Sequence, residues 1–210
     1  MLIEPAVFLF SLILFFLAVV IHEYAHGVTA YWLGDRTAKY AGRLTLNPLA
    51  HIDPFGTVLL PILLMISRSP VIFGWAKPVP INYWGLKNPK RDMLWVGLSG
   101  PLANIILAVI LSLIMKVAHG LPGVITHLIL QGILINLTLA VFNLMPIPPL
   151  DGSRIFISIL PAKLARQYAG IDRYGFIILF ILLYFRFFDY IIWPIVNILL
   201  GILRVESSFL

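Results

Sequence analysis

The chain has 210 residues, of which 60% are hydrophobic and only 11% are charged. Soluble domains contain about 45–50% apolar and about 25% charged residues, so this composition excludes a water-soluble fold and indicates a protein embedded in a lipid bilayer. The formal net charge is +6, but the 15 lysines and arginines are dispersed between apolar blocks. This dispersal disfavours a nucleic-acid partner and suits contact with lipid headgroups. Because the sequence has no cysteine, a bound metal would need His, Asp or Glu ligands.

The apolar segments predict an all-α polytopic membrane protein with about five transmembrane helices, since a helix needs about 20 apolar residues to cross the hydrocarbon core. The first segment has neither a basic region before it nor a small-residue cleavage pattern after it, so we expect a retained helix and not a signal peptide. The expected helices follow the charge-free segments 5–21 (continuing to 35), 93–115, a run over 117–150 with a turn at 120–123, and the shorter 174–185 and 190–203, which could also be interfacial.

The segment 54–75 is apolar but is interrupted by Pro61, a Ser-Arg-Ser-Pro sequence and Gly74. Basic residues flank it on both sides, and basic loops face the cytoplasm, so we predict a re-entrant hairpin with both ends on that side. The same rule places the amino terminus outside. Between the first helix and the hairpin, residues 40–46 alternate in character and are expected to form a short β segment or a plain connector.

Three ionisable residues stand within the first predicted helix, in the sequence His22-Glu23-Tyr-Ala-His26. Such groups are costly inside a bilayer and usually mark function. On a helix His22 and His26 share a face one turn apart, so both imidazoles can bind one divalent ion, with Glu23 beside them. Zinc acidifies water, and an adjacent carboxylate can take the proton as the water attacks a carbonyl. The pattern is typical of a zinc hydrolase, and a chance coincidence on a polar helix face is the alternative.

A catalytic zinc usually has three protein ligands, and the third is expected to be Asp151. This residue ends a long apolar run and follows Pro146, Pro148 and Pro149. Prolines stop a helix, and irregular backbone at membrane depth is tolerated where it lines a wet cavity. The first helix and the helix before Asp151 both run from outside to inside, so we expect the ligands at a similar depth. The alternative is an ordinary turn aspartate at the membrane surface.

These motifs resemble those of the site-2 proteases, zinc metalloproteases that cut transmembrane substrates inside the bilayer. The resemblance covers roughly residues 1–155. It rests on His22-Glu23-x-x-His26, on Asn143 with the ending Pro-x-Pro-x-Leu-Asp151-Gly, and on Gly42-Arg-Leu-Thr-Leu-Asn-Pro, Gly74-Trp-Ala-Lys-Pro-Val-Pro and Ser99-Gly-Pro-Leu-Ala-Asn.

The resemblance implies that His22, His26 and Asp151 bind one Zn²⁺ per chain, that Glu23 is the general base, and that Asn143 contacts substrate or the reacting oxyanion. It also implies one integral-membrane protease domain over residues 1–210, with a catalytic core over 1–155 and C-terminal helices over 172–204. We expect a compact form without PDZ or CBS domains.

The implied function is hydrolysis of peptide bonds within transmembrane segments of membrane proteins, as in regulated intramembrane proteolysis. The expected location is the plasma or inner membrane of a prokaryote, as a multi-pass protein with its site nearer the cytoplasmic face. Two alternatives are a membrane metal carrier and a non-catalytic binding protein of the same fold. Transporters often show paired repeats and several polar sites along a path, and the sequence shows neither.

Other polar residues in the apolar segments receive structural interpretations. Asn104 and Asn136 are expected to form hydrogen bonds between helices. His51, His119 and His127 each lack a histidine or acidic partner at helical spacing and are expected to be structural or interfacial.

Overall fold

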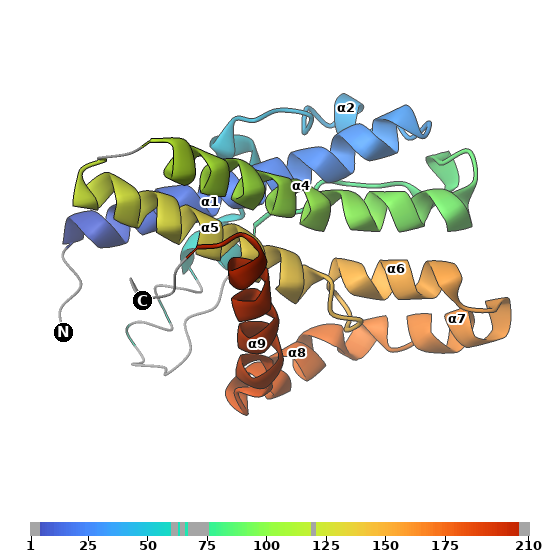
Figure 1. Cartoon of the computed structure of the whole chain (residues 1–210). Coiled ribbons are helices and arrows are strands. Elements are labelled where there is room, and N and C mark those ends of the chain that lie inside the picture. Colours follow the sequence, from blue (N-terminus) through green and yellow to red (C-terminus); the bar gives the residue numbers. More distant parts are fainter. Residues whose placement is uncertain (1–4, 60–62, 64–65, 67–75, 119–120, 206–210) are drawn as a thin grey trace.

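The computed structural model describes residues 5–59, 63, 66, 76–118 and 121–205. Three long helices form the centre of the molecule, namely α1 (Pro5–Trp32), α4 (Pro89–Val117) and α5 (Gly123–Asn143). α1 and α5 run in the same direction and α4 runs antiparallel to both (Figure 1). All three are long and apolar enough to cross a membrane, which agrees with the predicted segments.

The helix ends follow from local sequence. α4 begins with Pro89 at its first position, and the Asp92 carboxylate accepts a hydrogen bond from the Asn88 N–H at 2.7 Å. A proline at this position removes an N–H that would have no partner, and the aspartate satisfies another one. α5 ends at Asn143, ahead of the three prolines that precede Asp151. The chain then turns sharply into α6 (Asp151–Ile159).

α6 packs closely on α4 because Gly97 leaves room for it. A Cβ atom at Gly97 would lie 3.0 Å from Cγ1 of Ile155 and 3.4 Å from the carbonyl oxygen of Asp151. α7 (Ala162–Ala169) turns back along α6 (Figure 1). The Tyr168 hydroxyl of α7 donates a hydrogen bond of 2.6 Å to the carbonyl of Pro146, in the turn before Asp151.

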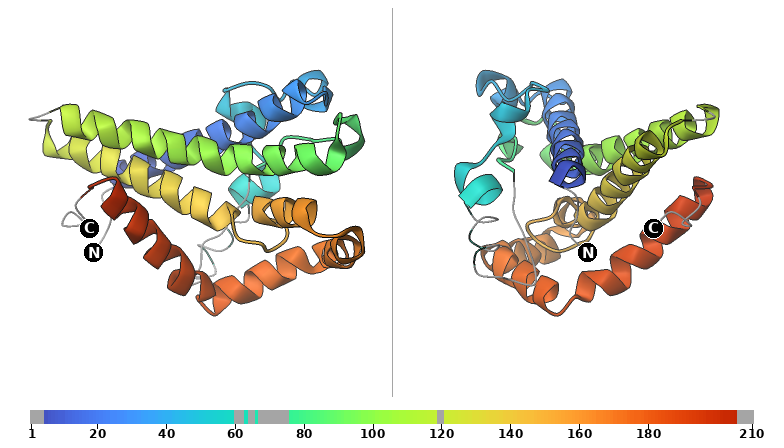
Figure 2. Two further views of the ribbon diagram at one scale, coloured as in Figure 1. Left: turned by 45° about the vertical axis from the view of Figure 1, so that its right-hand side comes forward. Right: turned by 90° about the vertical axis from the view of Figure 1, so that its left-hand side faces the viewer.

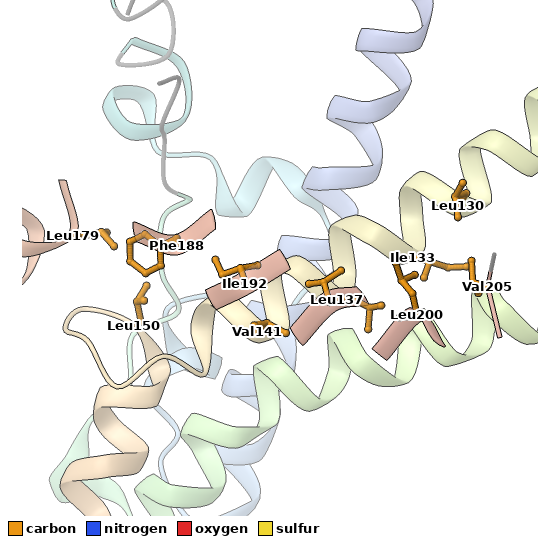
Figure 3. Close-up of a cluster of buried hydrophobic side chains, with 12 residues drawn as sticks. Leu130, Ile133, Leu137, Val141, Leu150, Leu179, Phe188, Ile192, Leu200 and Val205 are labelled. Atoms are coloured by element: carbon orange, nitrogen blue, oxygen red, sulfur yellow. The ribbon is translucent and has the colours of Figure 1, made fainter. Parts of the chain in front are cut away.

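The last two helices, α8 (Gly175–Tyr184) and α9 (Phe187–Ile202), form a V that is visible from the side (Figure 2). Arg186, at the junction, has a positive φ of 55°. In one buried apolar cluster, side chains of α9 pack along α5, and the cluster extends to α8 (Figure 3). Its members are Ala108, Leu130, Ile133, Leu137, Val141, Leu150, Leu179, Phe188, Ile192, Val196, Leu200 and Val205.

Short helical turns connect the long helices. They are α2 (Thr37–Tyr40), η1 (Pro48–His51), η2 (Pro54–Leu59), η3 (Tyr83–Gly85) and η4 (Asp172–Tyr174). Several of them carry polar contacts described below.

The expected count of five spans is not confirmed. Within the described residues, three helices are candidate spans, or four if the bent pair Ala162–Tyr184 and Phe187–Ile202, which meet at 78°, counts as one. α8 and α9 have 10 and 16 residues. At 1.5 Å per residue they are about 15 and 24 Å long, too short to cross a core of about 30 Å singly.

The short β segment expected at residues 40–46 does not form, and the described residues contain no strand. Tyr40 ends α2, and the next residues cap that helix, with Gly42 at a φ of 65° and the Arg43 N–H donating to the carbonyl of Ala38 at 2.9 Å. These backbone groups are used locally and cannot form a ladder. Most of the predicted re-entrant hairpin at 54–75 lies outside the described residues, and its first residues belong to η2.

Candidate metal centre

Three side chains that could hold a metal ion meet at one point between α1, α4 and α6. His22 and His26 lie one turn apart on α1, and Asp151 is the first residue of α6. The two histidine Nε2 atoms are 3.0 Å apart, and Oδ2 of Asp151 lies 2.9 Å from the first and 3.1 Å from the second. All three residues are buried, with at most 8% of their surface exposed. Sequence reasoning predicted this set, and the structure brings its members together.

The other ring nitrogen of each histidine is held from outside the cluster. Nδ1 of His26 lies 2.6 Å from the carbonyl oxygen of Val96. Nδ1 of His22 lies 2.6 Å from Oδ1 of Asn104. A carbonyl oxygen only accepts, so Nδ1 of His26 carries its proton and donates. In the neutral ring Nε2 then bears the lone pair that points into the cluster.

A chain of amides fixes the tautomer of His22 in the same way. Nδ2 of Asn136 donates to the carbonyl of Gly132 at 2.8 Å, so its Oδ1 is the acceptor for Nδ2 of Asn104, also at 2.8 Å. Nδ2 of Asn104 donates as well to the carbonyl of Ala18 at 3.1 Å. Oδ1 of Asn104 therefore faces His22 and accepts its Nδ1 proton. This series of hydrogen-bonded amides links α5 and α4 to α1, which confirms the expected interhelical hydrogen bonds of both asparagines.

As a result, three acceptor atoms face one another. They are the two histidine Nε2 atoms, each with a lone pair, and the carboxylate oxygen Oδ2 of Asp151. Such atoms repel unless a cation lies among them. Zinc binds histidine nitrogen and carboxylate oxygen at about 2.0–2.2 Å, which places neighbouring tetrahedral ligands roughly 3.3 Å apart, close to the observed separations. The donor set therefore fits zinc.

Gly100 of α4 keeps the space beside the cluster clear. A Cβ atom built there would lie 2.6 Å from Nε2 of His22 and closer still to Nε2 of His26. No larger residue fits at this position without displacing the imidazoles. The glycine thus provides the room that an ion bound by these atoms would need.

Glu23 lies next to this cluster on α1 and is half-buried. Its Oε2 accepts a hydrogen bond of 2.8 Å from the backbone N–H of Val79. Its carboxylate is outside the group of three converging ligand atoms. A carboxylate beside a metal site, held by one oxygen, is in a suitable position to exchange a proton with water.

Comparison with known proteins identifies the family. The model described as Peptidase family M50 matches residues 116–183. YwhC of Bacillus subtilis, which is named as a zinc metalloprotease, is 38% identical over 184 residues, covering 84% of this chain and 80% of YwhC. The chain belongs to peptidase family M50.

Two other relatives share only part of their length with this M50 peptidase. Rip2 of Mycolicibacterium smegmatis is 32% identical over 167 residues, covering 78% of this chain and 62% of Rip2. The zinc metalloprotease MJ0392 of Methanocaldococcus jannaschii is 29% identical over 155 residues, covering 72% of this chain and 34% of MJ0392. No solved structure matches the chain significantly.

The family confirms the resemblance to site-2 proteases and identifies the chain as a zinc metalloprotease. With its apolar helices, this M50 peptidase is a multi-pass integral membrane protein. Membership also favours an enzyme over the metal carrier considered from the sequence.

The other polar residues that the sequence analysis singled out in this M50 peptidase form contacts outside the cluster. Asn143 ends α5, and its Nδ2 donates to the carbonyl of Leu139 at 3.0 Å. His51 is buried and its ring contacts the carbonyl of Thr45, whereas His127 is exposed and pairs with Gln131. His119 lies outside the described residues.

Sequence reasoning missed three groups that shape the site. It assigned no role to the carbonyl of Val96 or to Gly100, and it did not connect Asn104 to His22. Gly100 and Asn104 both belong to the Ser99-Gly-Pro-Leu-Ala-Asn motif, but the motif does not name the side chains that they contact. The carbonyl of Val96 acts through its position alone, which leaves no signal in the side chains.

Proposed function

We propose that this membrane zinc metalloprotease cuts peptide bonds within transmembrane segments of other membrane proteins, in regulated intramembrane proteolysis. One observation carries the proposal, namely the convergence of the His22, His26 and Asp151 acceptor atoms among helices that are apolar enough to span a bilayer. A peptide bond of a transmembrane helix can reach such a site only after local unwinding, since its backbone groups are otherwise paired.

In this proposal His22, His26 and Asp151 hold one zinc ion per chain. When bound, zinc supplies a Lewis acid that polarises a peptide carbonyl and increases the acidity of water. Two of the ligands lie on α1 and the third begins α6. The hydrogen bonds of Val96 and Asn104 keep both imidazoles in the required tautomer.

Glu23 is proposed as the general base. Its carboxylate takes a proton from the attacking water and delivers it to the departing amine, so the peptide bond breaks as the new carbon–oxygen bond forms. Asn143 is proposed to contact substrate or the oxyanion, because it ends α5 just before the turn that leads to Asp151. Only one of its two amide protons is needed for the bond to Leu139.

The proposed arrangement in the membrane is a single protease domain over residues 1–210. The site opens nearer the cytoplasmic face of a prokaryotic plasma membrane, because the basic residues around Arg154 and Lys163 follow Asp151.

A reporter fused after Lys77 should be cytoplasmic, and an external reporter would contradict this orientation.

The decisive experiment replaces Glu23 by Gln in the full-length protein reconstituted in proteoliposomes. The reporter substrate is a single transmembrane helix with glycine and asparagine at its centre and an epitope tag at each end. Glu23→Gln should keep wild-type zinc content and lose cleavage, whereas Asp172→Asn, which removes an exposed carboxylate outside the site, should keep both. Full cleavage by Glu23→Gln would refute the mechanism.

The ligand assignment is tested by metal content. His22→Ala and Asp151→Ala should each lose zinc, measured by mass spectrometry after dialysis. His127→Ala should keep it, because that ring is exposed and pairs with Gln131, which contacts Ser11 in the first part of α1. Unchanged zinc in both ligand variants would show that the metal binds elsewhere.

A further inference from the structure

An extended segment lies against α1 beside Glu23, and we call residues 77–82 the strap. Its sequence is Lys-Pro-Val-Pro-Ile-Asn. It has no regular secondary structure. It crosses Glu23 at Val79, whose N–H donates to Oε2 of the carboxylate at 2.8 Å. The Lys-Pro-Val-Pro motif, which the proposed mechanism does not otherwise use, thus contacts the proposed base.

The prolines make this contact specific. Pro78 and Pro80 have no N–H, so Val79 provides the only backbone donor between Lys77 and Ile81. Residues before a proline are restricted to extended conformations, which applies to both Lys77 and Val79. The strap therefore presents one N–H group on a stiff backbone.

Hydrogen bonds hold the strap on both sides of Val79. The Lys77 N–H donates to the carbonyl of His51 at 2.9 Å. The Asn82 N–H donates to Oδ2 of Asp35 at 2.7 Å. Between these points Nη2 of Arg43 donates to the carbonyls of Lys77 and Pro78 at 2.7 and 3.2 Å.

Arg43 is only 8% exposed, and in the described part of the chain no carboxylate pairs with it. Burial of a cation without a carboxylate partner is costly, so its hydrogen bonds must compensate. Both of its acceptors are strap carbonyls that immediately precede Val79. Arg43 thus acts on the part of the strap that reaches Glu23.

Gly27 allows the strap to approach α1 at this place. It lies one turn after Glu23 on the same helix face. A Cβ atom at Gly27 would lie 3.1 Å from Cγ1 of Val79 and 2.7 Å from Cδ2 of Leu44. Val79 itself is 5% exposed, so its side chain is packed and its N–H is held at one height along α1.

We propose that Arg43 is a positioning residue for Glu23 and acts through the strap. It holds the two carbonyls before Val79, and Val79 then occupies Oε2 of Glu23, which leaves Oε1 for proton transfer. This inference rests on the proposed role of Glu23 as the base. An error of about 1 Å in the position of a catalytic group can reduce turnover about 100-fold, so such support has a measurable effect.

The first test measures hydrogen exchange of the strap by mass spectrometry, with the full-length protein in detergent and without any substrate. Glu23→Ala should accelerate exchange at Val79 at least about tenfold, since it removes the acceptor. Arg43→Met should do the same by releasing the strap. The matched control is Arg36→Met, because Arg36 is an exposed arginine of the same connection and should leave the exchange unchanged.

The second test measures cleavage of the tagged reporter helix. Arg43→Met should reduce turnover about 10- to 100-fold at unchanged KM and unchanged zinc content, and Arg43→Lys, which keeps a cationic donor, should recover part of the loss. If Arg43→Met does not fold, Arg43→Gln serves instead, because its shorter side chain withdraws the donor from the strap carbonyls and should raise exchange and lower turnover in the same way.

The outcomes separate this inference from the proposed function. Unchanged exchange at Val79 or full turnover in the folded Arg43→Met protein, or in Arg43→Gln where that variant is needed, refutes positioning by Arg43 even if Glu23→Gln is inactive. Loss of zinc in step with turnover also refutes it. Full cleavage by Glu23→Gln removes Glu23 as the base, whatever the exchange shows.

Discussion

Replacement of Gly100 by alanine should remove the metal without unfolding the protein. The added Cβ would lie 2.6 Å from Nε2 of His22, about 0.8 Å inside ordinary van der Waals contact, and closer still to Nε2 of His26. The Cβ is fixed to the α4 backbone, so the imidazoles must move. Distances from zinc to its ligands are specified to about 0.2 Å, so a displacement of this size should weaken zinc binding at least about 100-fold.

The same substitution favours helix, since alanine is about 1 kcal/mol better than glycine in a helix interior. The folded fraction should therefore not fall. Zinc affinity is measured by competition with a chromophoric chelator, and helicity by circular dichroism in detergent. Gly201→Ala of α9 is the matched control, because the same helix-favouring change there meets no atom within 4 Å of the added Cβ. Zinc affinity of Gly100→Ala within threefold of wild type would refute the assigned metal position.

Three further variants test other contacts. Asn104→Ala should lower zinc affinity about 10- to 100-fold, measured by the same competition, because His22 loses the partner that fixes its tautomer; unchanged affinity would show that the contact is dispensable. Gly152→Ala should destabilise the fold by more than 2 kcal/mol in a denaturant titration, about the scale of a buried steric defect, since its Cβ would overlap the carbonyl of Leu144. Burial and a nearby carboxylate raise the pKa of Tyr168, so the neutral hydroxyl stabilises the fold at neutral pH and this contribution is lost as pH rises through the raised pKa. Tyr168→Phe should therefore flatten the alkaline decline in melting temperature, and an unchanged decline would contradict this.

The three clustered side chains of the candidate metal site could be predicted from sequence because each leaves a local signal. His22 and His26 have helical spacing inside an apolar segment, and Asp151 follows prolines that end a helix. The long helices were predictable for a similar reason, since a run of apolar residues of sufficient length has few alternatives in a membrane. These features depend on short stretches of the chain, and the geometry agrees with them.

Features that depend on packing were not predictable. Residues 40–46 alternate like a strand, but the backbone N–H groups of residues 40–43 donate to the carbonyls of residues 36–39 at the end of α2, and pattern alone does not reveal that competition. The contact of Val79 with Glu23 joins distant parts of the chain through a backbone N–H, which has no signature in the side chains. The expected count of five spans is not confirmed, because the break at Arg186 divides the last apolar region of the described chain into pieces too short to cross alone.

The position of Asp151 has a consequence for biogenesis. The two histidines lie on α1, and the carboxylate that completes the candidate metal site lies on α6, after two further long helices. A chain synthesised from its amino terminus therefore holds His22 and His26 before Asp151 exists. The three side chains meet only when α6 packs on α4 at Gly97, so binding of one metal ion by all three requires that the later helices have already assembled.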